Sequence, residues 1–210
     1  MSVEWPPSPP EGYRKHDPEY GQSWLVTGFL FCWLIGILAA IPALVISVHD
    51  PDTAVRIVRE VLQPDTVDEW TAYIGWVVGT FAVLLVGHEA LHALTGRWFG
   101  LRTAFQFEYH HPLSWSPEIV TYGGFQSRGE LFAIALAPLV LLTPVSIAAL
   151  IWSHHLWMIA SATVLALGNS VGAVGDLASV WVLWSLPDGE LISHDSEGRR
   201  QYYTPVNEEK

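Results

Sequence analysis

VVGTFAVLLVGHEALHALTG, residues 77–96, is an apolar run of helical length that contains the pattern H-E-x-x-H. Its two histidines, His88 and His92, are four residues apart, so on an α-helix they lie about one turn apart on one face and can bind one metal ion. Glu89 follows His88 directly and can reach a water on that ion. The pattern therefore predicts zinc-activated hydrolysis, in which the metal acidifies the water and Glu89 accepts its proton.

The surroundings of the motif decide how it is interpreted, because a pattern this short also arises by chance. The ten residues before His88 carry no ionisable side chain. A charged side chain at the centre of a membrane helix costs about 2.5–3.5 kcal/mol on insertion scales. Three titratable side chains in such a helix are costly to retain, which favours a functional interpretation.

The composition excludes some classes of protein. Half of the 210 residues are hydrophobic, and 21 acidic residues outnumber 10 basic ones. Nucleic-acid binding is not expected, because phosphates require a basic surface. The acidic excess with only two lysines resembles the proteins of halophiles, although an acidic partner surface is the alternative. The single cysteine, Cys32, excludes an intrachain disulfide.

Four apolar segments predict the fold class, an all-α polytopic membrane protein. A helix needs about 20 apolar residues to cross the hydrocarbon core. The segments that meet this length are 24–48, 70–96, 130–152 and 156–186. Between the second and third segments, 103–109 (TAFQFEY) and 119–125 (IVTYGGF) have the composition of strands, which predicts a small β-like loop.

The polar ends of the chain complete the predicted organisation. The proline-rich segment 1–23 is expected to be an extended or disordered tail, 24–186 the four-helix transmembrane domain, and 187–210 an acidic polar tail. Eight of the ten Lys and Arg residues lie in the two tails and in 97–129. By the positive-inside rule we expect a multi-pass cell-membrane protein with both termini in the cytoplasm.

Two polar residues in the fourth apolar segment are candidates for the same site. With this topology the second and fourth helices run in the same direction, and Asp176 lies at about the depth of His88. Catalytic zinc commonly has three protein ligands, and no Lys or Arg in the four apolar segments can pair with Asp176. We therefore expect Asp176 to be the third ligand. Asn169 is a candidate to bind the oxyanion of the reaction, with a structural hydrogen bond as the alternative.

These motifs resemble those of a known group. HEALH in one transmembrane helix, followed by a β-like loop and by a late Asn and Gly-Asp, is similar to the site-2 protease group of intramembrane zinc metalloproteases. The closer resemblance is to their four-helix relatives, the putative zincin peptidases. The resemblance implies zinc held by His88, His92 and Asp176, Glu89 as general base, and a peptide substrate that adds as a strand to the loop 97–129.

The predicted function is therefore a membrane-embedded zinc metalloprotease that cleaves membrane-associated or transmembrane substrates. The expected partners are the lipid bilayer and a membrane protein or peptide, with no nucleic acid; the sequence leaves the oligomeric state open. The alternative is a catalytically inactive membrane scaffold with structural zinc. A gating or metal-exchange role for His110 and His111 also stays open, although a pair of surface histidines is more often an ordinary polar loop.

Overall fold

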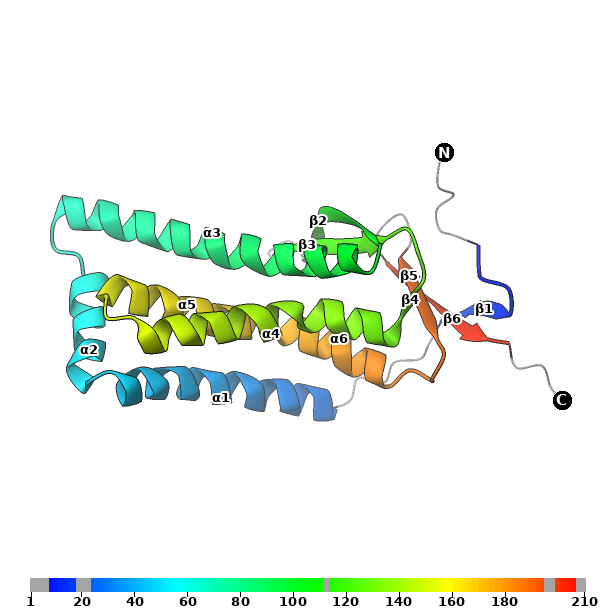
Figure 1. Cartoon of the computed structure of the whole chain (residues 1–210), viewed down its shortest axis with the longest axis horizontal. Coiled ribbons are helices and arrows are strands. Elements are labelled where there is room, and N and C mark those ends of the chain that lie inside the picture. Colours follow the sequence, from blue (N-terminus) through cyan, green and yellow to red (C-terminus); the bar gives the residue numbers. More distant parts are fainter. Residues whose placement is uncertain (1–7, 18–23, 112–113, 195–198, 207–210) are drawn as a thin grey trace. The chain divides into compact units, whose positions relative to one another are not determined.

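The computed structural model describes residues 8–17, 24–111, 114–194 and 199–206, with only the backbone described at 106–118. Its helices are α1 (Trp24–Val48), α2 (Pro51–Arg56), the π-helix η1 (Ile57–Val61), α3 (Val67–Trp98), α4 (Arg128–Trp152), α5 (Leu156–Gly172) and α6 (Val174–Trp184). Its strands are β1 (Tyr13–His16), β2 (Arg102–His111), β3 (Ser114–Tyr122), β4 (Gln126–Ser127), β5 (Leu191–His194) and β6 (Arg200–Pro205) (Figure 1).

The chain divides into two compact units. Unit 1 comprises Met1–Ser23, Glu89–Leu136 and Leu177–Lys210, and unit 2 comprises Trp24–His88 and Ala137–Asp176. Helices α3, α4 and α6 each contribute residues to both units. Each unit is therefore described by its own contacts.

Four helical stretches among the described residues are long and apolar enough to cross a membrane. They are Trp24–Val48, Val67–Trp98, Arg128–Trp152 and Leu156–Trp184. The fourth is interrupted at Ala173, where α5 ends and α6 begins. Gly172 and Gly175 flank this break, and each glycine costs about 1 kcal/mol relative to alanine in a helix interior. The expectation of an unbroken helix over 156–186 therefore differs from the structure at this point.

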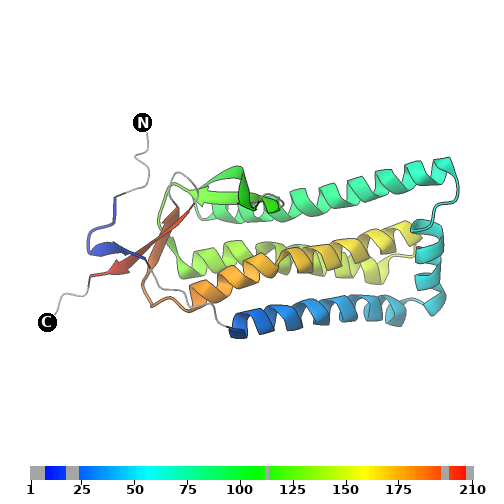
Figure 2. The same ribbon diagram turned by 180° about the vertical axis from the view of Figure 1, so that it is seen from behind.

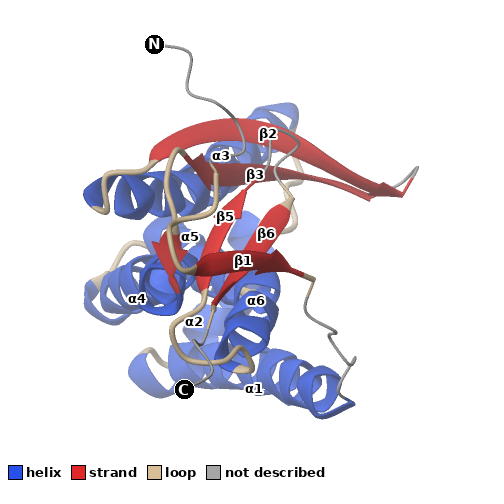
Figure 3. Cartoon of the chain, turned by 90° about the vertical axis from the view of Figure 1, so that its right-hand side faces the viewer, coloured by secondary structure: helices blue, strands red, loops and turns tan. Residues whose placement is uncertain are grey.

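The prediction of an all-α protein is confirmed only in part: the protein is mostly helical, but the described residues also form six strands. Two of them, β2 and β3, form the antiparallel two-stranded unit expected in 97–129. The other four form an antiparallel sheet in the order β1-β6-β5-β4 (Figure 3). Its strands β1 and β6 come from the segments expected to be polar tails, and they pair with each other. The division into tails and a central domain otherwise stays a prediction.

In unit 2 the helix α1 packs on α5. The buried apolar core consists of Ile41, Val45, Leu150, Ile159, Ala162 and Ala166. A polar contact reinforces this packing, since Trp33 Nε1 of α1 donates to Ser170 O of α5 at 3.0 Å. Trp76 Nε1 of α3 also donates to Ser161 Oγ of α5, at 2.7 Å. Large apolar side chains such as Phe31, Val86 and Val145 are more than 60% exposed, as expected of surfaces that contact lipid.

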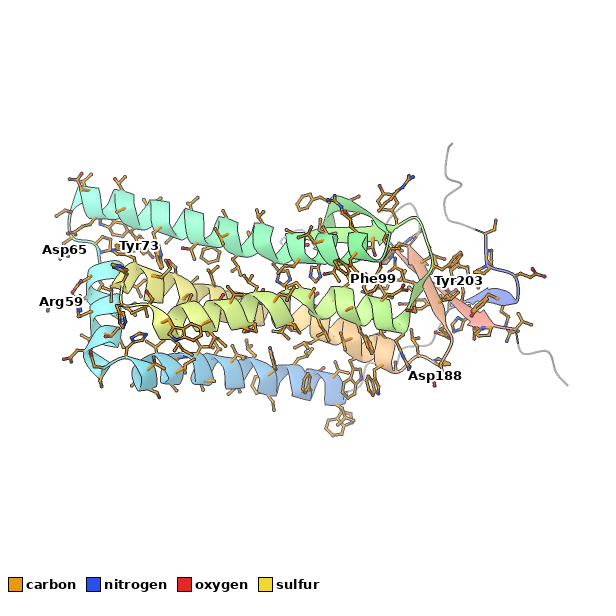
Figure 4. All side chains as sticks on the ribbon, in the orientation of Figure 1. Arg59, Asp65, Tyr73, Phe99, Asp188 and Tyr203 are labelled. Atoms are coloured by element: carbon orange, nitrogen blue, oxygen red, sulfur yellow. The ribbon has the colours of Figure 1, made fainter. Side chains whose placement is uncertain are left out.

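One end of unit 2 is closed by the short helices α2 and η1, which run crosswise to α1 and α5 in both opposite views (Figures 1 and 2). Asp50 caps α2 by accepting from Thr53 N at 2.9 Å, and Pro51 occupies the first turn, where its missing N–H costs nothing. Arg59 and Asp65 lie at this end (Figure 4). The connector between α1 and α3, which includes these crosswise helices, therefore places charged residues at this end of unit 2.

In unit 1 the four-stranded sheet has its own core. Leu131 of α4 and Leu183 of α6 pack with Leu186, Ile192 and Tyr202. On β6, Tyr203 is 2% exposed (Figure 4). Its ring meets that of Phe125 edge-on, with the ring centroids 5.1 Å apart. Apolar packing thus anchors the sheet to the start of α4, which follows β4, and to the end of α6, which precedes β5.

Candidate metal and catalytic site

The first half of the candidate site lies in unit 2, where His88 of α3 meets Asp176 of α6. The His88 Nε2 and Asp176 Oδ2 atoms are 3.3 Å apart, and their side chains are 13% and 19% exposed. A tetrahedral zinc ion with ligand bonds of about 2.0–2.2 Å separates two of its ligand atoms by about 3.3–3.6 Å. This spacing therefore fits two ligands of one zinc ion.

His88 is oriented by Asn169 of α5. The Nδ1 atom of His88 lies 2.9 Å from Asn169 Oδ1, and Asn169 Nδ2 donates to Pro138 O at 2.9 Å and to Thr143 Oγ1 at 2.8 Å. Because the carbonyl of Pro138 can only accept, the amide of Asn169 must direct its oxygen toward His88. The proton of His88 then lies on Nδ1, which leaves the Nε2 lone pair for a metal.

The second half of the site lies in unit 1, where His92 is 8% exposed. Its Nδ1 lies 2.8 Å from the main-chain oxygen of Ile134 in α4. A carbonyl oxygen only accepts, so this hydrogen bond also requires the proton on Nδ1 and leaves Nε2 available. Both histidines of the motif therefore have the tautomer that a metal ligand needs.

Helix α3 joins the two halves, because it is continuous from His88 to His92. One turn of an α-helix separates the two rings, so both lie on one face. Together with Asp176, they form a group of three that could hold a metal ion, each offering one ligand atom. Two imidazoles and one carboxylate are a donor set found in catalytic zinc sites. The residues present therefore fit zinc.

Glu89 contacts strand β3. Its Oε2 accepts a hydrogen bond from the main-chain N–H of Ile119 at 3.1 Å. Ile119 is paired with Phe105 of β2, and alternate residues of an antiparallel strand direct their N–H groups away from the partner strand. The N–H of Ile119 that reaches Glu89 therefore lies on the outer edge of the hairpin, and this edge borders the carboxylate predicted to be the base.

Helix α3 also approaches β3 closely at Gly96. A Cβ atom at this position would lie 2.7 Å from Thr121 Cγ2, which is closer than carbon atoms pack. Thr121 is held in turn, because its hydroxyl is hydrogen-bonded to Gln126 Nε2 at 3.1 Å. The glycine thus permits the contact that places β3 beside Glu89.

The structure describes contacts for the five residues proposed for the metal and catalytic site. Within unit 2, His88 contacts both Asn169 and Asp176. The described contacts of Glu89 and His92 lie within unit 1. The side chains of His110 and His111 lie outside the part that the structure describes.

Sequence reasoning missed the groups that orient the ligands. Two of them are main-chain groups, the oxygen of Ile134 and the N–H of Ile119, and no residue type identifies such groups. Thr143 was also missed, because a threonine within an apolar helix usually bonds to its own helix. One sequence signal did exist, since a proline four residues after Ile134 leaves that carbonyl without its helical donor.

The fold and the site together define a mostly helical protein with helices of membrane-spanning length and a group of two histidines and one carboxylate that could hold a metal ion. The model of the family described as Putative zincin peptidase matches residues 81–191, which is more than half of the chain. The chain therefore belongs to this family, which supports a zinc metallopeptidase. No curated protein and no solved structure matches it.

Proposed function

We propose that this protein is a membrane-embedded zinc metallopeptidase of the site-2 protease type, which hydrolyses peptide bonds of membrane-associated or transmembrane substrates. The observation that carries the proposal is the 3.3 Å separation of His88 Nε2 and Asp176 Oδ2, with the Nδ1 of His88 held by Asn169. This arrangement presents the correct nitrogen and a carboxylate oxygen at the spacing of zinc ligands.

His88, His92 and Asp176 would hold the zinc ion, which supplies Lewis-acid activation of water and of the scissile carbonyl when bound. Three protein ligands leave a fourth position open, as in catalytic sites, whereas a structural zinc is normally closed by four. Glu89 then takes a proton from the attacking water and passes it to the leaving amine. The contacts of Asn169 orient His88, and an oxyanion contact remains the alternative role for this residue.

The peptide substrate would be held as a strand along the outer edge of β3. Support comes from Glu89, which already binds one main-chain group of that edge, the N–H of Ile119. An extended peptide that pairs with an exposed strand is bound through its main chain and is aligned whatever its sequence. A peptide paired with β3 would therefore pass beside the proposed base.

The membrane location is supported by the four helical stretches of sufficient length and hydropathy. We propose that the protein crosses the cell membrane four times with both termini in the cytoplasm, as the Lys and Arg distribution indicates. A transmembrane segment or a short membrane peptide is then the substrate class, and the bilayer is the second partner.

The test compares Glu89→Gln with Glu60→Gln, a matched change at an exposed residue that pairs with Arg56 at 3.1 Å. Bound zinc and cleavage of a membrane peptide are measured on each purified full-length variant. Glu89→Gln is expected to retain zinc and to lose about 10²–10⁴-fold in cleavage rate, while Glu60→Gln matches the wild type. Normal cleavage by Glu89→Gln would refute the mechanism, and zinc without any cleavage in the wild type would favour an inactive scaffold.

A further inference from the structure

Helix α4 contains a proline, Pro138, at a buried position. Pro138 is among the fully buried side chains, and it lies within a helix that continues to Trp152. In an α-helix the N–H of residue i bonds the carbonyl of residue i−4. Proline has no N–H, so Pro138 cannot donate to the carbonyl of Ile134.

The carbonyl that Pro138 leaves without its helical donor is the one that His92 uses. His92 Nδ1 lies 2.8 Å from Ile134 O. An ordinary residue at position 138 would supply an N–H to the same oxygen, so the imidazole would share its acceptor with a second donor and be held less strongly. The proline therefore makes a strong acceptor available inside an apolar helix, where nearly all carbonyls are engaged.

The carbonyl of Pro138 itself serves the other histidine. Asn169 Nδ2 donates to Pro138 O at 2.9 Å, which fixes the amide so that its oxygen accepts from His88 Nδ1. Pro138 thus affects both histidines of the motif. Its missing N–H leaves the Ile134 carbonyl to His92, and its own carbonyl oxygen fixes the amide that binds His88.

We propose that Pro138 is a positioning residue of the metal site, which sets the tautomer of His92 by leaving the Ile134 carbonyl free and orients His88 through Asn169. This inference rests on the proposed function only in assuming that the two histidines bind zinc. Hydrogen-bond partners of metal-binding histidines hold the ring in place and raise the basicity of the ligand nitrogen. Pro138 would therefore raise the affinity of the site without touching the ion.

The chain offers a matched control in the same helix. Pro144 also lies within α4 and also lacks an N–H, but the carbonyl four residues before it belongs to Val140, whose side chain is 61% exposed. Pro144→Ala therefore makes the same chemical change in the same helix without adding a donor to Ile134.

The experiment measures zinc affinity of the purified full-length protein by competition with a chelator. Pro138→Ala is expected to bind zinc about 10–100-fold more weakly than the wild type, and Pro144→Ala within about twofold of it. A third variant carries lactic acid at position 138, the ester analogue of alanine, which removes the ring but still has no N–H. We expect this variant to bind zinc far more tightly than Pro138→Ala.

The second readout is independent of zinc. In the metal-free protein with neutral histidines, ¹⁵N NMR shifts report which ring nitrogen of His92 carries the proton. The wild type and the lactic acid variant are expected to show the Nδ1–H form, and Pro138→Ala to lose it in part or fully. An unchanged tautomer in Pro138→Ala, or an equal loss of affinity in Pro138→Ala and Pro144→Ala, would overturn the proposal. A wild type without zinc would instead refute the proposed function, while the NMR comparison would still test Pro138.

Discussion

Replacing Asn169 by alanine tests how the site holds His88. The side chain of Asn169 is fully buried and makes three hydrogen bonds of 2.8–2.9 Å, to His88, Pro138 and Thr143. Asn169→Ala removes all three and leaves a cavity in their place. Each buried polar group that loses its partner costs about 1–3 kcal/mol, so we expect a clear loss of thermal stability.

The more informative effect is on zinc. Because the variant loses the acceptor that holds Nδ1–H of His88, zinc affinity should fall about 10–100-fold, or about 1.4–2.7 kcal/mol. Cleavage should then recover when zinc is raised. Thr143→Val is the graded control, since it removes one contact of Asn169 and leaves the contact with His88.

The assay is therefore a zinc titration of cleavage and of metal binding for both variants in the same detergent. If Asn169 instead binds the oxyanion, Asn169→Ala should keep normal zinc affinity and lose about 10²–10³-fold in kcat at saturating zinc. That result would refute the orienting role argued from the hydrogen bonds.

Two further predictions concern unit 1. Gly96→Ala should destabilise by about 1–3 kcal/mol through the 2.7 Å contact with Thr121 Cγ2. Adding Thr121→Ser removes the methyl group that the alanine side chain would contact. Because alanine favours a helix over glycine by about 1 kcal/mol, the double variant should be at least as stable in thermal unfolding as Thr121→Ser alone. A double variant as unstable as Gly96→Ala would contradict this prediction. At the sheet, burial raises the pKa of Glu190, and His16, whose Nε2 lies 3.0 Å from the carboxylate, opposes this only in part. The folded state thus binds the proton of Glu190 more tightly than the unfolded state does. The stability of the wild type relative to Glu190→Gln should therefore fall as pH rises from about 4 toward 7. A stability difference that stays constant or reverses over this range would contradict this prediction.

Much of the candidate site could be predicted from the sequence because two of its proposed ligands have a fixed local spacing. His88 and His92 are one helical turn apart wherever the helix forms, and the uncharged residues around them predict that helix. Asp176 was expected by matching depths along two helices, and the structure brings its carboxylate to His88. Regular helices of known rise make such long-range estimates possible.

The remaining features depend on contacts that no local pattern encodes. The strands Tyr13–His16 and Arg200–Pro205 are short and polar, and the first pairs with the second across nearly the whole chain. The second also pairs with Leu191–His194. The flanking glycines only weaken the helix at Ala173, so whether the helix breaks there depends on tertiary packing. His88 is hydrogen-bonded to the amide oxygen of Asn169, and His92 to the main-chain oxygen of Ile134. Each acceptor reaches its histidine only after the helices have packed.

The proposed function requires one catalytic zinc ion held by His88, His92 and Asp176. Its most direct test is the zinc content of the purified full-length protein, measured for the wild type, His92→Ala and Asp176→Ala after equilibration with a weak chelator. We expect about one zinc per chain in the wild type and almost none in either variant. Full zinc content in Asp176→Ala or His92→Ala, or none in the wild type, would contradict it.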